Sequence, residues 1–341
     1  PEEDGMAKNG FQIIDSEPHF MEPLELWIEK LPEPFRSRTN VIQANHNGLL
    51  EGRGARLEVD GVEKPPIDPN PMVQQRSARR VPAVPLLAKV NENPVPDVFL
   101  EGFDVEGIDV GVFMPTAAMR IVRYDGMDPE HSLALCQVYN DYAAEFCRSH
   151  PDRFKFWAWV PPHDAKLAAG EARRAVKELG AVAVAMTGGA VNGNLLCDEF
   201  FDPLWEEMNR LGTAFGMHGP PANYNLKDNY NHRYRGHRGM GLVGNAMTGP
   251  VHAQTQLAEL IIGGVLDRFP NLKPVFMEVN ASWLPWFLWR LDDKWETNRP
   301  DLEIKLSIAP SEFFRRQCYC VVEPEEEPIK YTIDYMGADN L

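Results

Sequence analysis

The chain has 341 residues, of which 44% are hydrophobic and 25% are charged, and its formal net charge at pH 7 is −16. This length suits a single α/β barrel with insertions, and the apolar content is enough for a large core. The acidic balance argues against nucleic acids and anionic membranes as partners, because both require a basic field. A small anionic substrate would instead need a local basic pocket.

The five cysteines show no paired spacing, and no apolar run reaches the length of a membrane span. An odd cysteine count without a signal peptide is typical of a reduced chain, so we expect a cytoplasmic protein. Cys318 and Cys320 alternate on a strand-like run. We therefore expect these two side chains to pack rather than to react.

Short β-rich runs alternate with amphipathic stretches along the chain, which predicts βα units around a parallel sheet. The predicted strands are 11–15, 109–115, 154–162, 181–187, 213–219, 273–279 and 318–324. Helices are predicted over 129–151, 164–180, 202–212 and 255–270. Several of these helices begin at a capping Asp and end at a Gly or before a Pro.

Two segments interrupt this alternation within what we interpret as one domain over residues 1–341. Residues 36–96 are rich in Pro, Asn and Gly, and they predict an excursion after the first strand. This excursion contains a hairpin turn at Asp60 and Gly61. Residues 219–250 form a second excursion after the fifth strand.

Seven parallel strands cannot close a barrel, and they would leave two bare edges. We therefore expect a (β/α)8 TIM barrel whose last strand lies beyond Leu341. We also expect the natural start at Met6, because Pro1 cannot be an initiator residue. The residues before Met6 would then belong to a tag or to a longer chain.

The stretch IIDSEPHFMEP, residues 13–23, ends an apolar run in acidic residues and a histidine. Glu17 and His19 are two residues apart, so on a strand they point to the same face. A carboxylate beside an imidazole is either an ion pair or half of a metal site. His218 and Glu278 also fall at the ends of predicted strands, where the active groups of a barrel lie. Two histidines and a same-face carboxylate favour a divalent metal site over two structural histidines.

Several motifs together are similar to amidohydrolase family 2, a branch of the metal-dependent TIM-barrel hydrolases. They occur in the family's order over nearly the whole chain except residues 36–96. They are DSEPHFMEP, GIDVGVFMPT, YNDYAAEFCRSHPDRFKFWAWVPPHD, DPLWEEMNRLGTAFGMHG, GGVLDRFPNLKPVFMEVNASWLPWFLWRLD and YMGADNL. The branch includes the aminocarboxymuconate semialdehyde, resorcylate and carboxyvanillate decarboxylases.

This resemblance implies one divalent metal ion bound by Glu17, His19 and His218, together with an Asp beyond Leu341. Most of the superfamily has His-x-His where this chain has Glu-x-His. The carboxylate makes the site more oxygen-rich, which is compatible with zinc and also suits manganese or iron. The resemblance further implies a homodimer.

The resemblance favours non-oxidative decarboxylation of a small aromatic or enoic carboxylic acid. The related decarboxylases have a catalytic histidine at the end of the sixth strand, where this chain has Glu278. Glu278 therefore serves either as acid/base or as a group that orients a neighbour. Hydrolysis of an amide, ester or carbon–carbon bond by metal-activated water stays open. An inactive barrel that acts as a binding partner is a second alternative.

Other polar residues are weaker candidates. His252 opens a predicted helix and is a second catalytic candidate. Basic residues that could bind a substrate carboxylate, or form surface ion pairs instead, are Arg120, Arg233, Arg235 and His237. The run Glu325–Glu327 is interpreted as a solvated charge run and not as a ligand cluster.

Overall fold

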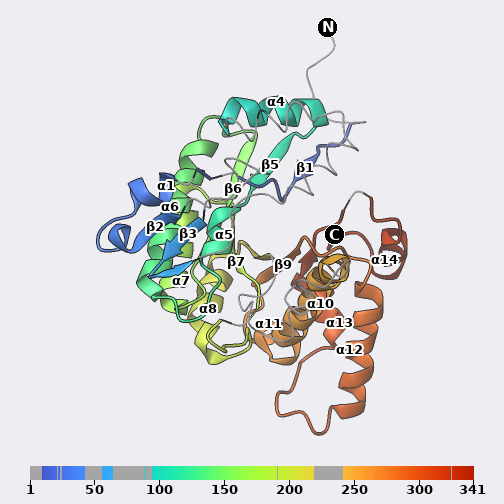
Figure 1. Ribbon diagram of the computed structural model, residues 1–341. Helices are drawn as coiled ribbons and strands as arrows, with labels where there is room; N and C mark the ends of the chain where they lie inside the picture. The colour runs from blue at the N-terminus through green and yellow to red at the C-terminus, as the bar shows by residue number, and fades with distance from the viewer. Residues whose placement is uncertain are drawn as a thin grey trace. The chain divides into compact units, whose positions relative to one another are not determined.

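The computed structural model describes residues 10–42 except 21 and 24, 56–63, 89, 94–218 except 190, and 241–341 except 324. The chain divides into two compact units, which are described separately (Figure 1). The first unit comprises Pro1–Val122, Glu130–Trp159 and Ala175–Val182. The second comprises Arg123–Pro129, Val160–Arg174 and Ala183–Leu341.

The first unit contains three parallel strands in the order β1, β5, β6. These are β1 (Ile14–Asp15), β5 (Val110–Phe113) and β6 (Phe154–Trp159). Its helices are α1 (Glu25–Lys30), η1 (Arg36–Arg38), α4 (Pro96–Glu106), α5 (Ala117–Ile121), α6 (Pro129–Cys147) and the π-helical η2 (Ala175–Leu179). A separate antiparallel sheet consists of β2 (Thr39–Ile42), β3 (Arg56–Val59) and β4 (Val62–Glu63).

An aromatic cluster forms the core of the first unit. Phe113 on β5 is fully buried, and its ring stacks on Phe20 at 4.6 Å and on Phe103 at 5.5 Å between centroids. The absence of a side chain at Gly111 lets the Phe103 ring lie against β5, since a Cβ there would be 2.2 Å from that ring. The core therefore depends on one glycine as well as on large apolar side chains.

The predicted hairpin turn is confirmed. Asp60 and Gly61 join β3 to β4 with φ angles of 56° and 73°. Positive φ at both central residues is typical of the tight turn that fits the twist of antiparallel strands.

The second unit contains four parallel strands in the order β7, β8, β9, β10. They are β7 (Ala183–Thr187), β8 (Ala214–His218), β9 (Lys273–Met277) and β10 (Tyr319–Cys320). Their register aligns the carboxyl ends, with His218 between Thr187 and Met277. The helices are α7 (Ala165–Arg174), η3 (Glu199–Phe201), α8 (Asp202–Leu211), α10 (Gly241–Ile262), α11 (Val265–Arg268), α12 (Leu284–Asn298), α13 (Pro310–Gln317) and α14 (Ile329–Met336).

Helix ends in the second unit follow local capping rules. The Asp164 side chain accepts backbone hydrogen bonds from Lys166 and Leu167 and so starts α7. Helix α8 ends at Gly212, which adopts a φ of 65°. Helix α10 differs from the prediction, because it begins at Gly241 and not at residue 255. Its first half contains several glycines and Pro250, which are weak helix formers and hide the helix from sequence patterns.

The α/β fold with parallel strands is confirmed, and each of the seven predicted strands is present. The single domain and the eighth strand stay predictions. None of the helices in the described part of the chain is long and apolar enough to cross a membrane. Cys318 and Cys320 are buried, as expected for packing residues.

Candidate functional site

Two candidate residues of the second unit meet at the carboxyl ends of neighbouring strands. His218 is the last residue of β8 and is 1% exposed, and Glu278 directly follows β9. The strand register sets His218 opposite Met277 and so brings Glu278 alongside it. His218 Nε2 lies 3.5 Å from Glu278 Oε2, and the Glu278 side chain is 64% exposed. A buried imidazole is thus combined with a carboxylate that a small molecule can reach.

The loop between β9 and α12 that carries Glu278 has an unusual backbone. Glu278 and Asn280 have φ angles of 54° and 58°, the left-handed region that residues with a Cβ disfavour. Such conformations cost of order 1–3 kcal/mol each and persist where surrounding contacts hold them. Trp283 Nε1 donates to the Asn280 carbonyl oxygen at 2.8 Å, and Cys320 Sγ donates to the same oxygen at 3.1 Å.

A carboxylate from the loop after β10 holds the same segment. Glu326 Oε1 accepts hydrogen bonds from the backbone N–H groups of Ala281 at 2.9 Å and Ser282 at 2.6 Å. The prediction that Glu325–Glu327 is a solvated run is therefore wrong for its middle residue, which is half-buried while its two neighbours are exposed. The run itself carries no signal that distinguishes Glu326.

Helix α10 contacts the segments that follow β7 and β9. A Cβ on Gly249 would lie 3.0 Å from the carbonyl oxygen of Glu278, and a Cβ on Gly188 would lie 2.1 Å from Gln256 Nε2. His252 is three residues after Gly249 and four before Gln256, so it belongs to the same helical stripe. We infer that His252 lies on the side of α10 that faces the carboxyl end of β8.

The environment of His252 keeps its imidazole neutral. Its Nε2 is buried and has no hydrogen-bond partner among the described residues. Burial lowers the pKa of His252 to about 4. At neutral pH this side chain is therefore uncharged, and its low pKa makes it a weak base.

In the first unit, the predicted metal ligands follow β1. His19 Nδ1 lies 3.0 Å from the carbonyl oxygen of Pro115, which can act only as an acceptor. Nδ1 therefore carries a hydrogen, and in the neutral imidazole the lone pair is on Nε2, as in metal-binding histidines. Strand β1 ends at Asp15, so the alternation behind the same-face prediction stops before Glu17. Asp15 instead fixes this loop, because its side chain accepts the Glu17 N–H at 3.0 Å.

The loop after β5 in the first unit is also held by a glutamate. The Glu22 carboxylate, 5% exposed, accepts hydrogen bonds from three consecutive backbone N–H groups at the start of α5. These donors are Thr116 at 2.9 Å, Ala117 at 3.0 Å and Ala118 at 3.2 Å. Helix α5 carries the half-buried Arg120, whose role as a substrate ligand stays a prediction.

The three predicted metal ligands do not form one cluster within a unit. Glu17 and His19 belong to the first unit and His218 to the second. Over the described ranges, no group of three or more His, Cys, Asp or Glu side chains could hold a metal ion. The side chains in each unit nevertheless have donor atoms that suit a divalent cation. His19 in the first unit can offer Nε2, and His218 in the second unit lies beside the Glu278 carboxylate. Arg233, Arg235 and His237 lie outside the described residues.

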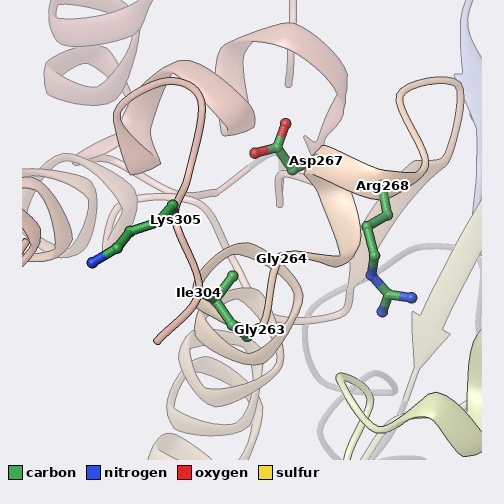
Figure 2. Close-up of a pocket in the computed structure, with 6 residues that line it drawn as sticks. All are labelled: Gly263, Gly264, Asp267, Arg268, Ile304 and Lys305. Atoms are coloured by element: carbon green, nitrogen blue, oxygen red, sulfur yellow. The ribbon is translucent and has the colours of Figure 1, made fainter. Parts of the chain in front are cut away.

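A cavity of about 280 Å³ in the second unit is separate from this site (Figure 2). It lies where α10 is followed by α11, before the amino end of β9, whereas His218 and Glu278 are at carboxyl ends. The side chains of Arg268 and Lys305 point in different directions in Figure 2. Asp267 already accepts hydrogen bonds from Ser307. The lining therefore does not converge on a ligand.

Comparisons with known proteins identify a family. An amidohydrolase family model, Amidohydro_2, matches residues 58–328. The chain is 28% identical over 243 residues to the 2-amino-3-carboxymuconate-6-semialdehyde decarboxylase of Dictyostelium discoideum. This match covers 71% of the chain but 63% of that relative, so the chain spans less than two thirds of the relative's length.

Solved structures show the same fold. The 5-carboxyvanillate decarboxylase of Sphingomonas paucimobilis matches with a TM-score of 0.63 and 23% identity, covering 96% of this chain and 86% of that one. A dihydroxybenzoic acid decarboxylase from Polaromonas sp. JS666 matches with a TM-score of 0.60 and 24% identity, covering 80% and 81%. That protein was solved with bound manganese and the inhibitor 2-nitroresorcinol.

Proposed function

Because this chain belongs to the amidohydrolase family, we propose that it catalyses the metal-dependent, non-oxidative decarboxylation of a small aromatic or enoic carboxylic acid. The observation that carries the proposal is the His218–Glu278 pair, with 3.5 Å between Nε2 and Oε2 at the carboxyl ends of β8 and β9. The decarboxylases among the relatives and the structural neighbours support the choice of reaction.

The reaction exchanges a carboxylate for a proton. The bond between the substrate carbon and the carboxylate breaks, carbon dioxide leaves, and the electron pair ends in a new carbon–hydrogen bond. The protein must therefore hold a proton close to that carbon. Glu278 is our candidate for this group, because its carboxyl is accessible beside a buried imidazole. The neutral His252 is the second catalytic candidate.

The metal and substrate ligands expected from the sequence are kept as part of this proposal. Glu17, His19 and His218 would hold one divalent metal ion, zinc or alternatively manganese or iron. Such an ion would supply positive charge that attracts a substrate carboxylate. Arg120, Arg233, Arg235 and His237 are proposed to orient the carboxylate. We further propose that the strands belong to a (β/α)8 barrel and that the protein is a homodimer.

Hydrolysis is the second candidate, and one specific observation favours it. The sequence resemblance implies a histidine in the related decarboxylases where this chain has Glu278. A carboxylate beside an imidazole is also suited to act as a general base toward water. The two reactions differ in product, since hydrolysis of an ester or amide releases no carbon dioxide.

The test combines metal content with product analysis. We expect the purified protein to contain about one divalent ion, and we expect Glu17→Ala and His218→Ala each to lower that content. Glu29→Ala on α1 and His150→Ala are matched controls of the same residue types outside the candidate site. Carbon dioxide release is then measured with a panel of hydroxybenzoates and enoic diacids.

Each result of this test has a defined meaning. Unchanged metal content in both ligand variants would contradict the metal site. Turnover of esters or amides without carbon dioxide release from the panel would favour hydrolysis. A stable, metal-free protein with neither activity would favour a role as a binding partner.

A further inference from the structure

We propose that Glu326 is a positioning residue that acts through Glu278, and the part of this inference that concerns activity rests on the proposed function. Its carboxylate fixes the loop between β9 and α12 in the conformation that brings Glu278 to His218. Neither the family match nor the sequence pattern assigns a role to Glu326. The inference comes from the contacts of this loop.

The loop between β9 and α12 starts at the candidate site and ends at α12. Glu278 leaves β9 with a positive φ, Asn280 repeats the positive φ, and α12 begins at Leu284. A residue with a Cβ leaves this region readily when nothing holds it, and the direction of the chain then changes. The position of the Glu278 carboxylate therefore depends on how firmly the following residues are held.

Ala281 is held on both sides of its peptide backbone. Its N–H donates to Glu326 Oε1 at 2.9 Å, and its carbonyl oxygen accepts from Thr332 Oγ1 at 3.3 Å. Thr332 is fully buried on α14, the helix that follows Glu326. The segment after β10 thus contacts the loop after β9 through Glu326 and through Thr332. Strands β9 and β10 also pair directly.

The carboxylate of Glu326 is chemically suited to this task. One oxygen atom accepts from two consecutive N–H groups, those of Ala281 and Ser282. These groups lie just before the start of α12, where the helix dipole favours a negative charge. A neutral side chain would keep part of the hydrogen bonding and lose the charge.

The flanking residues offer matched controls. Glu325 and Glu327 have the same charge and are adjacent in sequence, but both are exposed. A general loss of negative charge after β10 would affect all three positions alike. A positioning role would affect Glu326 alone.

The experiment measures carbon dioxide release, manganese affinity and thermal stability for Glu326→Ala, Glu326→Gln, Glu325→Ala and Glu327→Ala. We expect Glu326→Ala to lower kcat by about 10- to 100-fold, as is typical when a group that orients a site residue is removed, with a smaller change in KM. Glu326→Gln should lose less, because its amide oxygen still accepts hydrogen bonds although it carries no charge. The two flanking variants should match the wild type.

A double variant separates positioning from a general structural effect. If Glu326 acts through Glu278, adding Glu326→Ala to Glu278→Ala should lower kcat no further. Multiplicative losses in the double variant, or an unchanged kcat in Glu326→Ala, would overturn the proposal. Should Glu326→Ala fail to fold, the same comparison with Glu326→Gln decides the question.

Amide hydrogen exchange provides a readout that does not depend on activity. We expect faster exchange in peptides covering residues 278–284 in Glu326→Ala and Glu326→Gln, but not in Glu325→Ala. If the wild type decarboxylates nothing in the panel, the proposed function fails, and exchange then decides the positioning role. Unchanged exchange in both Glu326 variants would overturn it.

Discussion

In each of the two units, a glutamate carboxylate holds the loop that follows a neighbouring strand. The two loops carry different kinds of residue. In the first unit Glu22, which follows β1, caps the segment after the neighbouring β5. In the second unit Glu326, which follows β10, caps the segment after the neighbouring β9. Both carboxylates accept hydrogen bonds from the backbone N–H groups of consecutive residues that are far away in sequence.

The difference between them lies in burial and in what each loop carries. Glu22 is 5% exposed, and its carboxylate caps the first turn of the short helix α5, most of whose residues are buried. Glu326 is half-buried and holds a left-handed loop that ends at Glu278. The same capping device therefore supports the core in one unit and the candidate site in the other. Removing the first should cost stability, and removing the second should cost activity.

The largest expected effect is on the stability of Glu22→Ala. This change leaves three buried N–H groups without their acceptor, and we expect the free energy of unfolding to fall by about 3 kcal/mol. Glu326→Ala should cost about 1 kcal/mol, as for the loss of a helix cap. Urea unfolding followed by circular dichroism measures both values.

Glu29→Ala, an exposed glutamate on α1, serves as the control and should change stability by less than about 0.5 kcal/mol. Equal losses in Glu22→Ala and Glu326→Ala would show that the two caps are energetically alike. The contrast drawn from their burial would then be wrong.

The next effect is a pH dependence of opposite sign in the two units. Burial lowers the pKa of His252 to about 4 from an ordinary value of 6.5, so the unfolded chain binds a proton between these values that the folded chain does not. Its contribution therefore makes stability fall as the pH drops from 6.5 towards 4. His252→Gln should remove about 2 kcal/mol of that loss, after allowance for solvent screening.

Burial raises the pKa of Glu22, and its backbone hydrogen bonds oppose this shift without reversing it. The folded state then binds a proton more readily than the unfolded state, so this contribution favours folding at low pH and is lost as the pH rises. Unfolding curves between pH 4 and 7 test both signs. An unchanged acid slope in His252→Gln would contradict the neutral, buried imidazole.

The smallest expected effect compares two helical glycines of the second unit. Gly170→Ala on α7 meets nothing within 4 Å, so it should stabilise the protein by about 1 kcal/mol through helix propensity. Gly249→Ala on α10 meets the Glu278 carbonyl oxygen at 3.0 Å, so its gain should be smaller and kcat should fall. Equal stability gains with unchanged kcat would show that α10 does not constrain the loop.

Much of the secondary structure and part of the site could be predicted from the sequence. Short apolar, β-rich runs mark the strands, Asp164 and Gly212 mark helix ends, and Asp60 with Gly61 marks the hairpin. These signals are short-range, because each depends on residues within a few positions. The assignment of His218 to the end of β8 follows from the same kind of signal.

The tertiary structure decided the contacts that act across the chain. Glu22 and its N–H donors are 94 to 96 residues apart, and Glu326 and its donors are 44 and 45 residues apart, so no local pattern distinguishes either glutamate from its neighbours. The approach of Glu278 to His218 depends on the register of β8 against β9 and on a left-handed backbone that a glutamate does not adopt by preference. Local propensity sets the elements, whereas hydrogen-bond partners in the folded chain set where the side chains between them point.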